Sequence, residues 1–297
     1  MSDLDVVAVG HALVDIRIIV DKFPGPDEEA EIREESRGSG GSAVNVAIDV
    51  SRLDGRSGII AKIGFDSFGR IVFDELWRNR VDVRGLRISP EGSTGFSLVV
   101  ITRDGDIAIY GSKGVADDLR PEELDIELIS NTRSIHIASL RLDTSLVAAK
   151  HARERGVLVS WDPGRRLSKL GLQRVSKLLS FVDIVFLNSE EAYALTGQDP
   201  LNAAKLIASR GPRHVVVKMG KEGALYYGDE GIRRIPAHRP ERVVDTTGAG
   251  DAFAAATLLK LVRGASIYEA LSYGSLIAAL KVSRLGSHNI PGKEDIS

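Results

Sequence analysis

The chain of 297 residues is long enough for one large domain, and its 43% hydrophobic and 27% charged residues are ordinary for a globular protein. Its formal net charge of -2 gives no reason to expect a nucleic-acid partner, and the absence of cysteine excludes disulfides and cysteine-ligated metals. Because no apolar run approaches the roughly 20 residues that span a bilayer and the N-terminus carries acids where a signal peptide carries bases, we expect a cytoplasmic protein without a membrane partner.

Residues 5–10 form an apolar run that ends in a glycine, which is typical of a buried parallel strand. Asp15 follows this glycine by five residues. Open α/β sheets bind ligands beyond the carboxyl ends of their strands, so Asp15 is a candidate ligand-binding residue. The alternative is an ordinary loop carboxylate.

Four short segments have strand-like composition and are separated by polar residues, glycine or proline. They are residues 16–20, 30–35, 95–102 and 107–110. We expect them to form a second, small sheet within a single domain that covers residues 1–297, because such a sheet is too small to fold independently. Exposed strands commonly need a partner, so a homodimer through this sheet is a further expectation.

A glycine-rich stretch, GSGGSAVN at residues 38–45, precedes an apolar helix predicted at residues 46–53. Gly40 and Gly41 have no side chain and therefore allow the backbone to approach a ligand closely. Asn45 either binds that ligand or caps the helix, which is the commoner role of an asparagine at a helix N-terminus.

From residue 134 onward, predicted strands and helices alternate, which is the pattern of a parallel sheet with helices on both faces. The predicted strands are residues 134–139, 157–161, 184–187 and 214–219. The predicted helices are residues 145–155, 167–179, 190–195, 201–210, 252–262 and 267–282. No internal repeat or linker interrupts the pattern, so the fold class is α/β.

The segment DTTGAGDAFAA at residues 245–255 carries the clearest chemistry. Gly248 and Gly250 allow a sharp bend before the last-but-one helix, where unpaired N–H groups and the helix dipole favour an anion. Asp251 can accept a proton from a hydroxyl that approaches this anion, and we expect its pKa to be lowered by the dipole. The alternative is an ordinary turn with an acidic residue in the first helical turn.

Four motifs together resemble those of the ribokinase-like carbohydrate kinases, the PfkB family. They are GSGGSAVN at residues 38–45, IGFDSFG at 63–69, NSEE at 188–191 and DTTGAGD at 245–251, and their order and separation match the family over nearly the whole chain. The resemblance implies a three-layer α/β/α domain with a mainly parallel central sheet and a small β-sheet lid. It also implies transfer of the ATP γ-phosphoryl group to a hydroxyl of a sugar, polyol or nucleoside.

The resemblance assigns roles at the acceptor end and at the reacting phosphate. Asp251 is the expected general base, and the backbone of Gly248, Ala249 and Gly250 is expected to stabilise the transferring group. The residues expected to contact substrate hydroxyls are Asp15, Gly40, Gly41 and Asn45.

Asn188 and Glu191 match the motif that holds hydrated magnesium beside the phosphates in the family. Magnesium keeps several waters and takes few protein ligands, so an Asn and a Glu that act through water are chemically adequate. The alternative is the ordinary acidic first turn of a helix. We expect ATP and Mg²⁺ as cofactors.

The nucleotide is expected beside the KMGKEG segment that follows a predicted strand. Gly220 and Gly223 match the family's turn there, whereas Lys218 replaces a threonine of many relatives. Ser275 stands where many relatives place an Asn beside the adenine.

A monovalent cation, with potassium as the candidate ion, is held in some relatives by residues around two segments. These match DTT at residues 245–247 and VSRLG at residues 282–286 in this chain. The candidate cation-binding residues are Asp245, Thr247, Arg284 and Gly286.

Other classes fit the sequence less well. Neither the glycine-rich motif of P-loop kinases nor that of dinucleotide-binding domains occurs. A sugar-binding regulator on an inactive kinase scaffold remains an alternative, but such a protein has no need of Asp251 together with Asn188 and Glu191.

The acceptor is not identified by these motifs. Asp15 would repel an anionic group beside it, so we predict a neutral polyol or nucleoside. Arg141 and the arginines of DPGRR, Arg165 and Arg166, follow predicted strands and are either solvated or directed to the acceptor. If Arg141 or Arg166 faces the pocket, an acidic or phosphorylated sugar is the expected acceptor instead.

Overall fold

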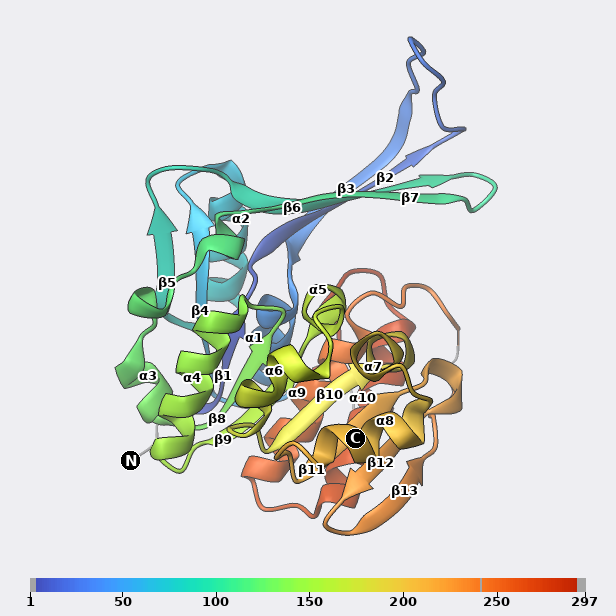
Figure 1. Ribbon diagram of the computed structural model, residues 1–297. Helices are drawn as coiled ribbons and strands as arrows, with labels where there is room; N and C mark the ends of the chain where they lie inside the picture. The colour runs from blue at the N-terminus through green and yellow to red at the C-terminus, as the bar shows by residue number, and fades with distance from the viewer. Residues whose placement is uncertain (1–3, 241, 293–297) are drawn as a thin grey trace.

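The computed structural model describes residues 4–240 and 242–292, and a nine-stranded sheet runs through its centre (Figure 1). All neighbouring strands of this sheet are parallel except at the edge, where β11, β12 and β13 pair in antiparallel fashion. In order across the sheet the strands are β13 (Gly231–Ile235), β12 (Ala224–Gly228), β11 (His214–Lys218), β10 (Ile184–Asn188), β9 (Leu158–Asp162), β8 (Thr132–Ala138), β1 (Leu4–Gly10), β4 (Ser57–Gly64) and β5 (Asp82–Ser89).

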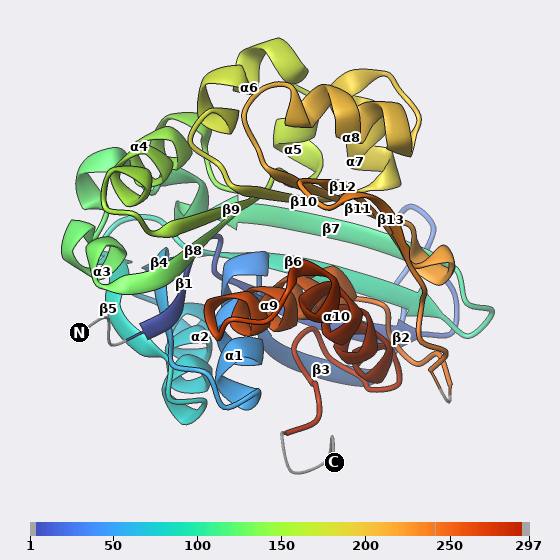
Figure 2. The ribbon, with the colours of Figure 1, turned by 90° about the horizontal axis from the view of Figure 1, so that it is seen from below.

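Helices cover both faces of the sheet, as Figure 2 shows. One face carries α1 (Ser42–Arg52), α2 (Ser67–Arg78), α9 (Ala249–Val262) and α10 (Ile267–Val282). The other face carries α3 (Ile126–Ser130), α4 (Leu142–Glu154), α5 (Gly164–Ser168), α6 (Leu172–Leu179), α7 (Ser189–Thr196) and α8 (Pro200–Ala208). Within the described ranges, none of these helices is both long and apolar enough to cross a membrane.

The alternation of side chains along the strands divides the core into two clusters. In β1, Val6 and Ala8 point into the cluster under α1 and α9, while Val7 and Val9 point into the cluster under α4. Burial on both faces explains why these strands are continuous apolar runs in the sequence. The predicted layered α/β architecture therefore has a direct cause in the sequence pattern.

The four segments predicted as a second sheet do pair with one another. This small sheet has the strand order β3 (Ile32–Gly40), β2 (Leu13–Val20), β6 (Thr94–Thr102) and β7 (Ile107–Gly114), and it projects from the body of the molecule (Figure 1). The large apolar side chains exposed on this sheet include Ile32, Ile107, Ile109 and Tyr110. A homodimer through the sheet stays a prediction.

Several element predictions were wrong or incomplete. The single helix predicted at 167–179 is two helices, α5 and α6, because Gly171 at the start of α6 has a φ of 78° that a continuous helix cannot contain. Asp15 lies within strand β2, so the alternative reading as a loop carboxylate is wrong. Helices α2 and α3, strand β5 and the antiparallel edge had no counterpart among the predicted elements, and the ends of the predicted single domain, 1–3 and 293–297, lie outside the described residues.

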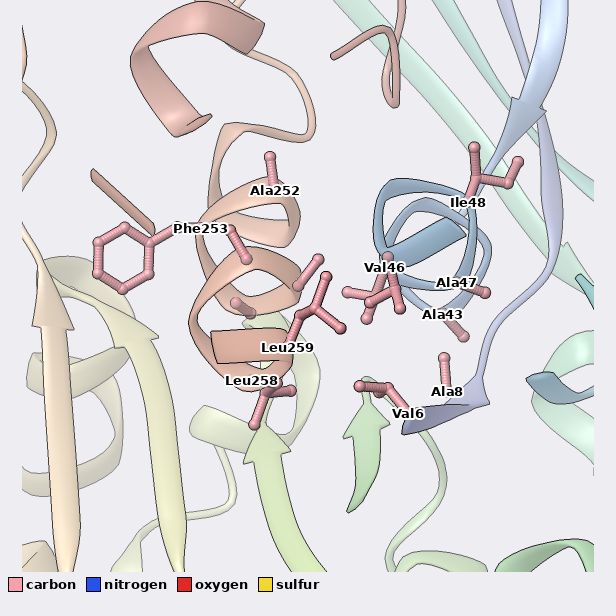
Figure 3. Close-up of a cluster of buried hydrophobic side chains, with 14 of the residues drawn as sticks. Val6, Ala8, Ala43, Val46, Ala47, Ile48, Ala252, Phe253, Leu258 and Leu259 are labelled. Atoms are coloured by element: carbon pink, nitrogen blue, oxygen red, sulfur yellow. The ribbon is translucent and has the colours of Figure 1, made fainter. Parts of the chain in front are cut away.

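Helices α1 and α9 pack directly against each other and so bring together two distant motifs (Figure 3). Fully buried Val46 and Ala47 of α1 share one cluster with Ala252 and Leu259 of α9. Burying a valine side chain contributes about 1.5–3 kcal/mol, and the small alanines let the helices approach closely. The N-terminal turns of the two helices are therefore held side by side.

Candidate active site

Two hollows meet at the N-terminus of α9. An apolar hollow of about 410 Å³ has Phe253 and Ala278 in its wall, and a charged hollow measures about 470 Å³. Lys218 and Gly250 line both of them. The charged hollow is lined by His11, Ser42, Lys113, Ser139, Asp162, Gly164, Arg165, Arg166, Asn188, Glu191, Lys218, Gly248, Gly250 and Asp251.

The boundary between the hollows is built to receive an anion. Gly248 caps α9 with a φ of 77°, and a Cβ at this position would lie 1.7 Å from the carbonyl oxygen of Ser287, so only glycine fits. Among the described residues, the backbone N–H groups of Gly250 and Asp251 have no hydrogen-bond partner. A Cβ on Gly250 would lie 3.0 Å from Lys218 Nζ, so the ammonium group also reaches this helix terminus.

The carboxylate of Asp251 is hydrogen-bonded to a residue of the glycine-rich stretch at residues 38–45. Asn45 Nδ2 donates a hydrogen bond to Asp251 Oδ2 at 2.7 Å. Helix α1 begins at Ser42, so Asn45 lies inside the helix and does not cap it. Its buried Oδ1 has no hydrogen-bond partner among the described residues, which leaves an acceptor for a ligand hydroxyl.

The expected direction of the Asp251 pKa shift was wrong. Burial raises the pKa of Asp251 to about 6, and the opposing hydrogen bond from Asn45 only reduces this shift. Desolvation of the carboxylate therefore outweighs the helix dipole. At pH 7 roughly nine-tenths of such a group is still ionised, so it can accept a proton.

Lys218 lies among carboxylates in the charged hollow. Its Nζ is 3.0 Å from Asp162 Oδ2 at the end of β9. Burial alone would lower the pKa of Lys218, but Asp162 and Glu191 raise it above its usual value. The lysine is therefore a permanent cation beside the α9 N-terminus.

Asn188 and Glu191 form a reciprocal cap at the start of α7. Asn188 Oδ1 accepts from the Glu191 N–H at 2.8 Å, and Glu191 Oε2 accepts from the Asn188 N–H at 2.9 Å. The alternative of an acidic first helical turn is therefore also present, and both residues line the charged hollow. Burial, followed by the charge of Asp162, raises the pKa of Glu191 to about 7.

This donor set fits magnesium that is held largely through water and phosphate. No group of three His, Asp or Glu side chains arranged to hold a metal directly occurs in the described part of the chain. However, the charged hollow is lined by three carboxyl groups, those of Asp162, Glu191 and Asp251. The pKa values of Glu191 and Asp251 are raised, and a bound cation would favour the ionised forms of these groups. Asn188 and Glu191 would hold the ion.

The glycines expected at the acceptor end are required by close packing. A Cβ on Gly40 would lie 2.2 Å from the Asp15 carboxylate, and a Cβ on Gly41, which has a φ of 92°, would lie 2.5 Å from the His11 carbonyl oxygen. Asp15 accepts a hydrogen bond from the Ser287 hydroxyl, and burial raises its pKa. Asp15, Gly40 and Gly41 do not line the charged hollow, so their contact with substrate stays a prediction.

Three further cations line the charged hollow besides Lys218. Lys113 comes from β7 of the small sheet, and Arg165 and Arg166 come from α5. Arg166 forms an ion pair with Asp117, whereas Lys113 and Arg165 form none with any described side chain. Arg141 lies in a neighbouring hollow, where it pairs with Asp143 at 2.6 Å.

His11 is buried beside this group and was not predicted. Its Nε2 lies 2.9 Å from Asp117 Oδ1, and burial, reinforced by the charge of Lys113, lowers the pKa of His11 to about 4. The histidine is therefore neutral at pH 7. Neither His11 nor Lys113 belongs to a motif, whereas Asp162 could have been recognised as the first residue of DPGRR.

The apolar hollow is lined by residues that were predicted to contact the nucleotide. Gly220, Gly223 and Ser275 are all in its wall. A Cβ on Gly223 would lie 2.0 Å from the Ile235 carbonyl oxygen, which explains this glycine by backbone packing. The Ser275 hydroxyl already donates to the Pro236 carbonyl oxygen at 2.7 Å, so its contact with a nucleotide stays a prediction.

Two of the residues predicted for a monovalent cation, Thr247 and Gly286, form hydrogen bonds with a third, Asp245. Its Oδ1 accepts from the Thr247 N–H at 2.9 Å, and its Oδ2 accepts from the Gly286 N–H at 3.0 Å. The backbone N–H of Arg284 donates to Lys281. Burial would raise the pKa of Asp245, but these N–H groups and the ammonium of Lys281 lower it to about 2.

Comparison with known proteins connects this geometry with a family. The sequence pattern described as pfkB family carbohydrate kinase matches residues 3–293. The chain is 34% identical to an ATP-dependent ribose-1-phosphate kinase of Halopiger xanaduensis over 98% of this chain and 96% of the relative. It is 30% identical to a nucleoside kinase of Methanothermobacter thermautotrophicus over 98% of this chain and 93% of the relative.

Solved structures confirm the predicted fold. A ribokinase of Arabidopsis thaliana, described in complex with ribose and ATP, superposes with a TM-score of 0.90 at 25% identity, covering 99% of this chain and 97% of that chain. A ribokinase of Thermotoga maritima superposes with a TM-score of 0.88 at 25% identity, covering 99% and 98%.

Proposed function

The chain belongs to the pfkB family of carbohydrate kinases, and from this premise we propose that it transfers the γ-phosphoryl group of ATP to a hydroxyl of a sugar substrate. One observation carries this proposal. The apolar hollow and the charged hollow meet at Lys218 and Gly250, where a helix terminus presents free N–H groups next to a carboxylate that can act as a base. ATP in the first hollow and an acceptor in the second would place the reacting phosphoryl group at this junction.

Asp251 is the general base in this mechanism. It takes the proton of the acceptor hydroxyl as that oxygen attacks the γ-phosphorus, while the phosphorus–oxygen bond to the departing ADP breaks. The hydrogen bond from Asn45 orients the carboxylate and favours its charged form. The unpartnered Oδ1 of Asn45 provides an acceptor for a second substrate hydroxyl.

The transferring group is stabilised by fixed positive charge. The N–H groups of Gly250 and Asp251 and the positive end of the α9 dipole point to this place without reorganisation. The ammonium of Lys218, which lies beside Gly250, adds a further positive charge. Magnesium, when bound with ATP, supplies further neutralisation of phosphate charge beside Asn188 and Glu191.

We infer that the acceptor carries a phosphate group. The sequence favoured a neutral polyol or nucleoside, on the condition that the arginines are solvated. Arg166 lines the charged hollow together with Arg165 and Lys113, and among these three cations only Arg166 forms an ion pair with a described side chain, that of Asp117. Such a site is suited to a dianionic group at the end of the acceptor away from Asp251. Ribose 1-phosphate, the substrate in the name of the Halopiger xanaduensis relative, has this form.

A neutral acceptor is the second candidate, and Asp15 is the observation that favours it. The carboxylate of Asp15 lies within electrostatic reach of Lys113 and would partly cancel its charge. The nucleoside kinase and the ribokinases among the similar proteins are named for neutral substrates. The alternative acceptor is therefore a free sugar or nucleoside whose hydroxyls form hydrogen bonds with Asp15 and Asn45.

The acceptor is tested by measuring ADP release with ribose 1-phosphate, ribose, fructose, fructose 6-phosphate, a keto-deoxy sugar acid and a panel of nucleosides. We expect the highest kcat/KM with a sugar phosphate. Arg166→Ala and Lys113→Ala should each raise the KM for that acceptor by roughly 10- to 100-fold, since each removes a charge-assisted hydrogen bond, and leave the KM for ATP unchanged. Arg174→Ala, an exposed arginine on α6, is the control. Preferred turnover of neutral compounds would support the second candidate.

A further inference from the structure

A lysine buried between α10 and the DTTGAG segment occupies the place predicted for a monovalent cation. The side chain of Lys281 has no exposed surface, and its Nζ donates to the main-chain carbonyl oxygen of Asp245 at 2.7 Å. The same Nζ lies 3.8 Å from Asp245 Oδ2. A carbonyl oxygen and a carboxylate of one residue therefore already face an internal ammonium group.

Both carboxylate oxygens of Asp245 also have hydrogen-bond donors. Arg17 of β2 donates to Asp245 Oδ2 at 2.9 Å, and the N–H groups of Thr247 and Gly286 donate to the carboxylate at 2.9 and 3.0 Å. A potassium ion needs a shell of oxygens to replace its waters. The residues present do not fit potassium, because these oxygens are occupied and Lys281 and Arg17 would repel a further cation.

We propose that Lys281 is a built-in replacement for the monovalent cation, a positioning residue that holds the DTTGAG segment at the N-terminus of α9. The ammonium binds the Asp245 carbonyl oxygen, and the N–H groups of Val244 and Asp245 donate to the Val282 carbonyl oxygen at 2.9 and 3.1 Å. The segment is thus fastened to the end of α10. Kinase turnover then needs no potassium, contrary to the expectation from the sequence.

The ammonium of Lys281 faces two carboxylates and one guanidinium group. Burial is the largest influence and lowers the pKa of the ammonium below its usual value; Arg17 acts in the same direction, and the carboxylates of Asp245 and Asp49 oppose this shift. Asp245 stays ionised because its own pKa is held at about 2. An amino group 2.7 Å from the main-chain carbonyl oxygen of Asp245 and 3.8 Å from its carboxylate occupies the place that a bound cation would otherwise take.

The wild-type protein gives the first test. Its kcat and its melting temperature without substrates are measured while KCl is exchanged for choline chloride at constant ionic strength. We expect both to be unchanged by the exchange. A kcat or a melting temperature that rises specifically with KCl overturns the proposal. The kcat measurement rests on the proposed function, whereas the melting temperature does not. A failure of the kinase assignment can therefore be distinguished from a failure of the proposal for Lys281.

A variant distinguishes a replaced cation from an ordinary buried lysine. Lys281→Ser leaves a space beside the Asp245 oxygens, so kcat should fall by roughly 10- to 100-fold in choline chloride and recover when KCl is added. Its melting temperature should also rise with KCl. Lys281→Met fills the space without charge and should not recover, and Lys150→Ser, at an exposed position on α4, should behave as wild type. A folded Lys281→Ser protein that responds to neither salt contradicts the proposal. If Lys281→Ser does not fold, the wild-type titration decides alone.

Discussion

The two aspartates that bound the DTTGAGD segment are six residues apart and have opposite environments. Asp245 is surrounded by donors, and its pKa is lowered to about 2 although burial opposes this. Asp251 is surrounded by fewer donors, and burial raises its pKa to about 6. The same residue type therefore serves as an anchor at one end of the segment and as a candidate base at the other, because the local hydrogen bonds differ.

The two pKa shifts have opposite consequences for stability. Asp245 has a lower pKa in the folded protein than the unfolded value of about 3.9, so it stabilises the fold above that pH and this contribution is lost as the pH falls toward 2. Asp251 has a raised pKa, so its ionisation destabilises the fold above about pH 6 and this cost is relieved as the pH falls from 6 to 4. A carboxylate that costs stability is expected where chemistry requires it.

The largest expected effect is on turnover by Asp251→Asn. The amide keeps the shape of the side chain but cannot accept the proton, so kcat should fall by roughly 10²- to 10⁴-fold while ATP affinity is retained. The free energy of unfolding at pH 7 should not decrease, because a destabilising buried charge is removed. Steady-state kinetics, calorimetric ATP titration and urea unfolding measure the three quantities. Asp229→Asn, at an exposed carboxylate of the β12–β13 turn, is the control.

The reverse pattern is expected for Asp245→Asn. Removing this carboxylate leaves the buried ammonium of Lys281 and the guanidinium of Arg17 without their counter-ion, so the free energy of unfolding at pH 7 should fall by about 3 kcal/mol. Urea unfolding at pH 7 measures this loss. The difference in unfolding free energy between wild type and variant should be smaller when both proteins are compared near pH 2. An unchanged unfolding free energy at pH 7 would mean that Asp245 is not an anchor.

A smaller effect is expected for Asn45→Ala. Without its hydrogen bond the carboxylate of Asp251 is less well oriented, so kcat/KM should fall by roughly 10-fold, and the pKa seen in the acid limb of the pH profile should rise. Asn131→Ala, at an exposed asparagine that ends α3, is the matched control. A loss of ATP affinity instead would indicate that Asn45 serves the nucleotide.

Much of the architecture could be predicted from the sequence because buried strands and amphipathic helices have distinct periods. The bend at Gly248 and Gly250 and the position of Asp251 at the α9 N-terminus followed from local residue types. The break at Gly171 did not, because a glycine within an apolar helical pattern does not by itself reveal a positive φ.

The missing parts of the site depend on contacts between distant segments. Lys113 reaches the charged hollow only because β7 belongs to the small sheet, and Lys281 meets Asp245 across 36 residues of chain. The hydrogen bond between Asn45 and Asp251 spans 206 residues. The raised pKa of Asp251 could not be predicted either, since the sequence suggests the helix dipole but not the extent of burial.

The most direct test of Asp251 as the base is the pH dependence of the phosphoryl-transfer rate in single turnovers of wild type and Asp251→Asn. In wild type we expect a rate that is constant above pH 7 and about tenfold lower at pH 5, one unit below the pKa of about 6. The slow residual rate of Asp251→Asn should lack this acid limb. An acid limb near pH 6 that persists in the variant, or a variant rate close to that of wild type, would contradict the assignment of Asp251 as the general base.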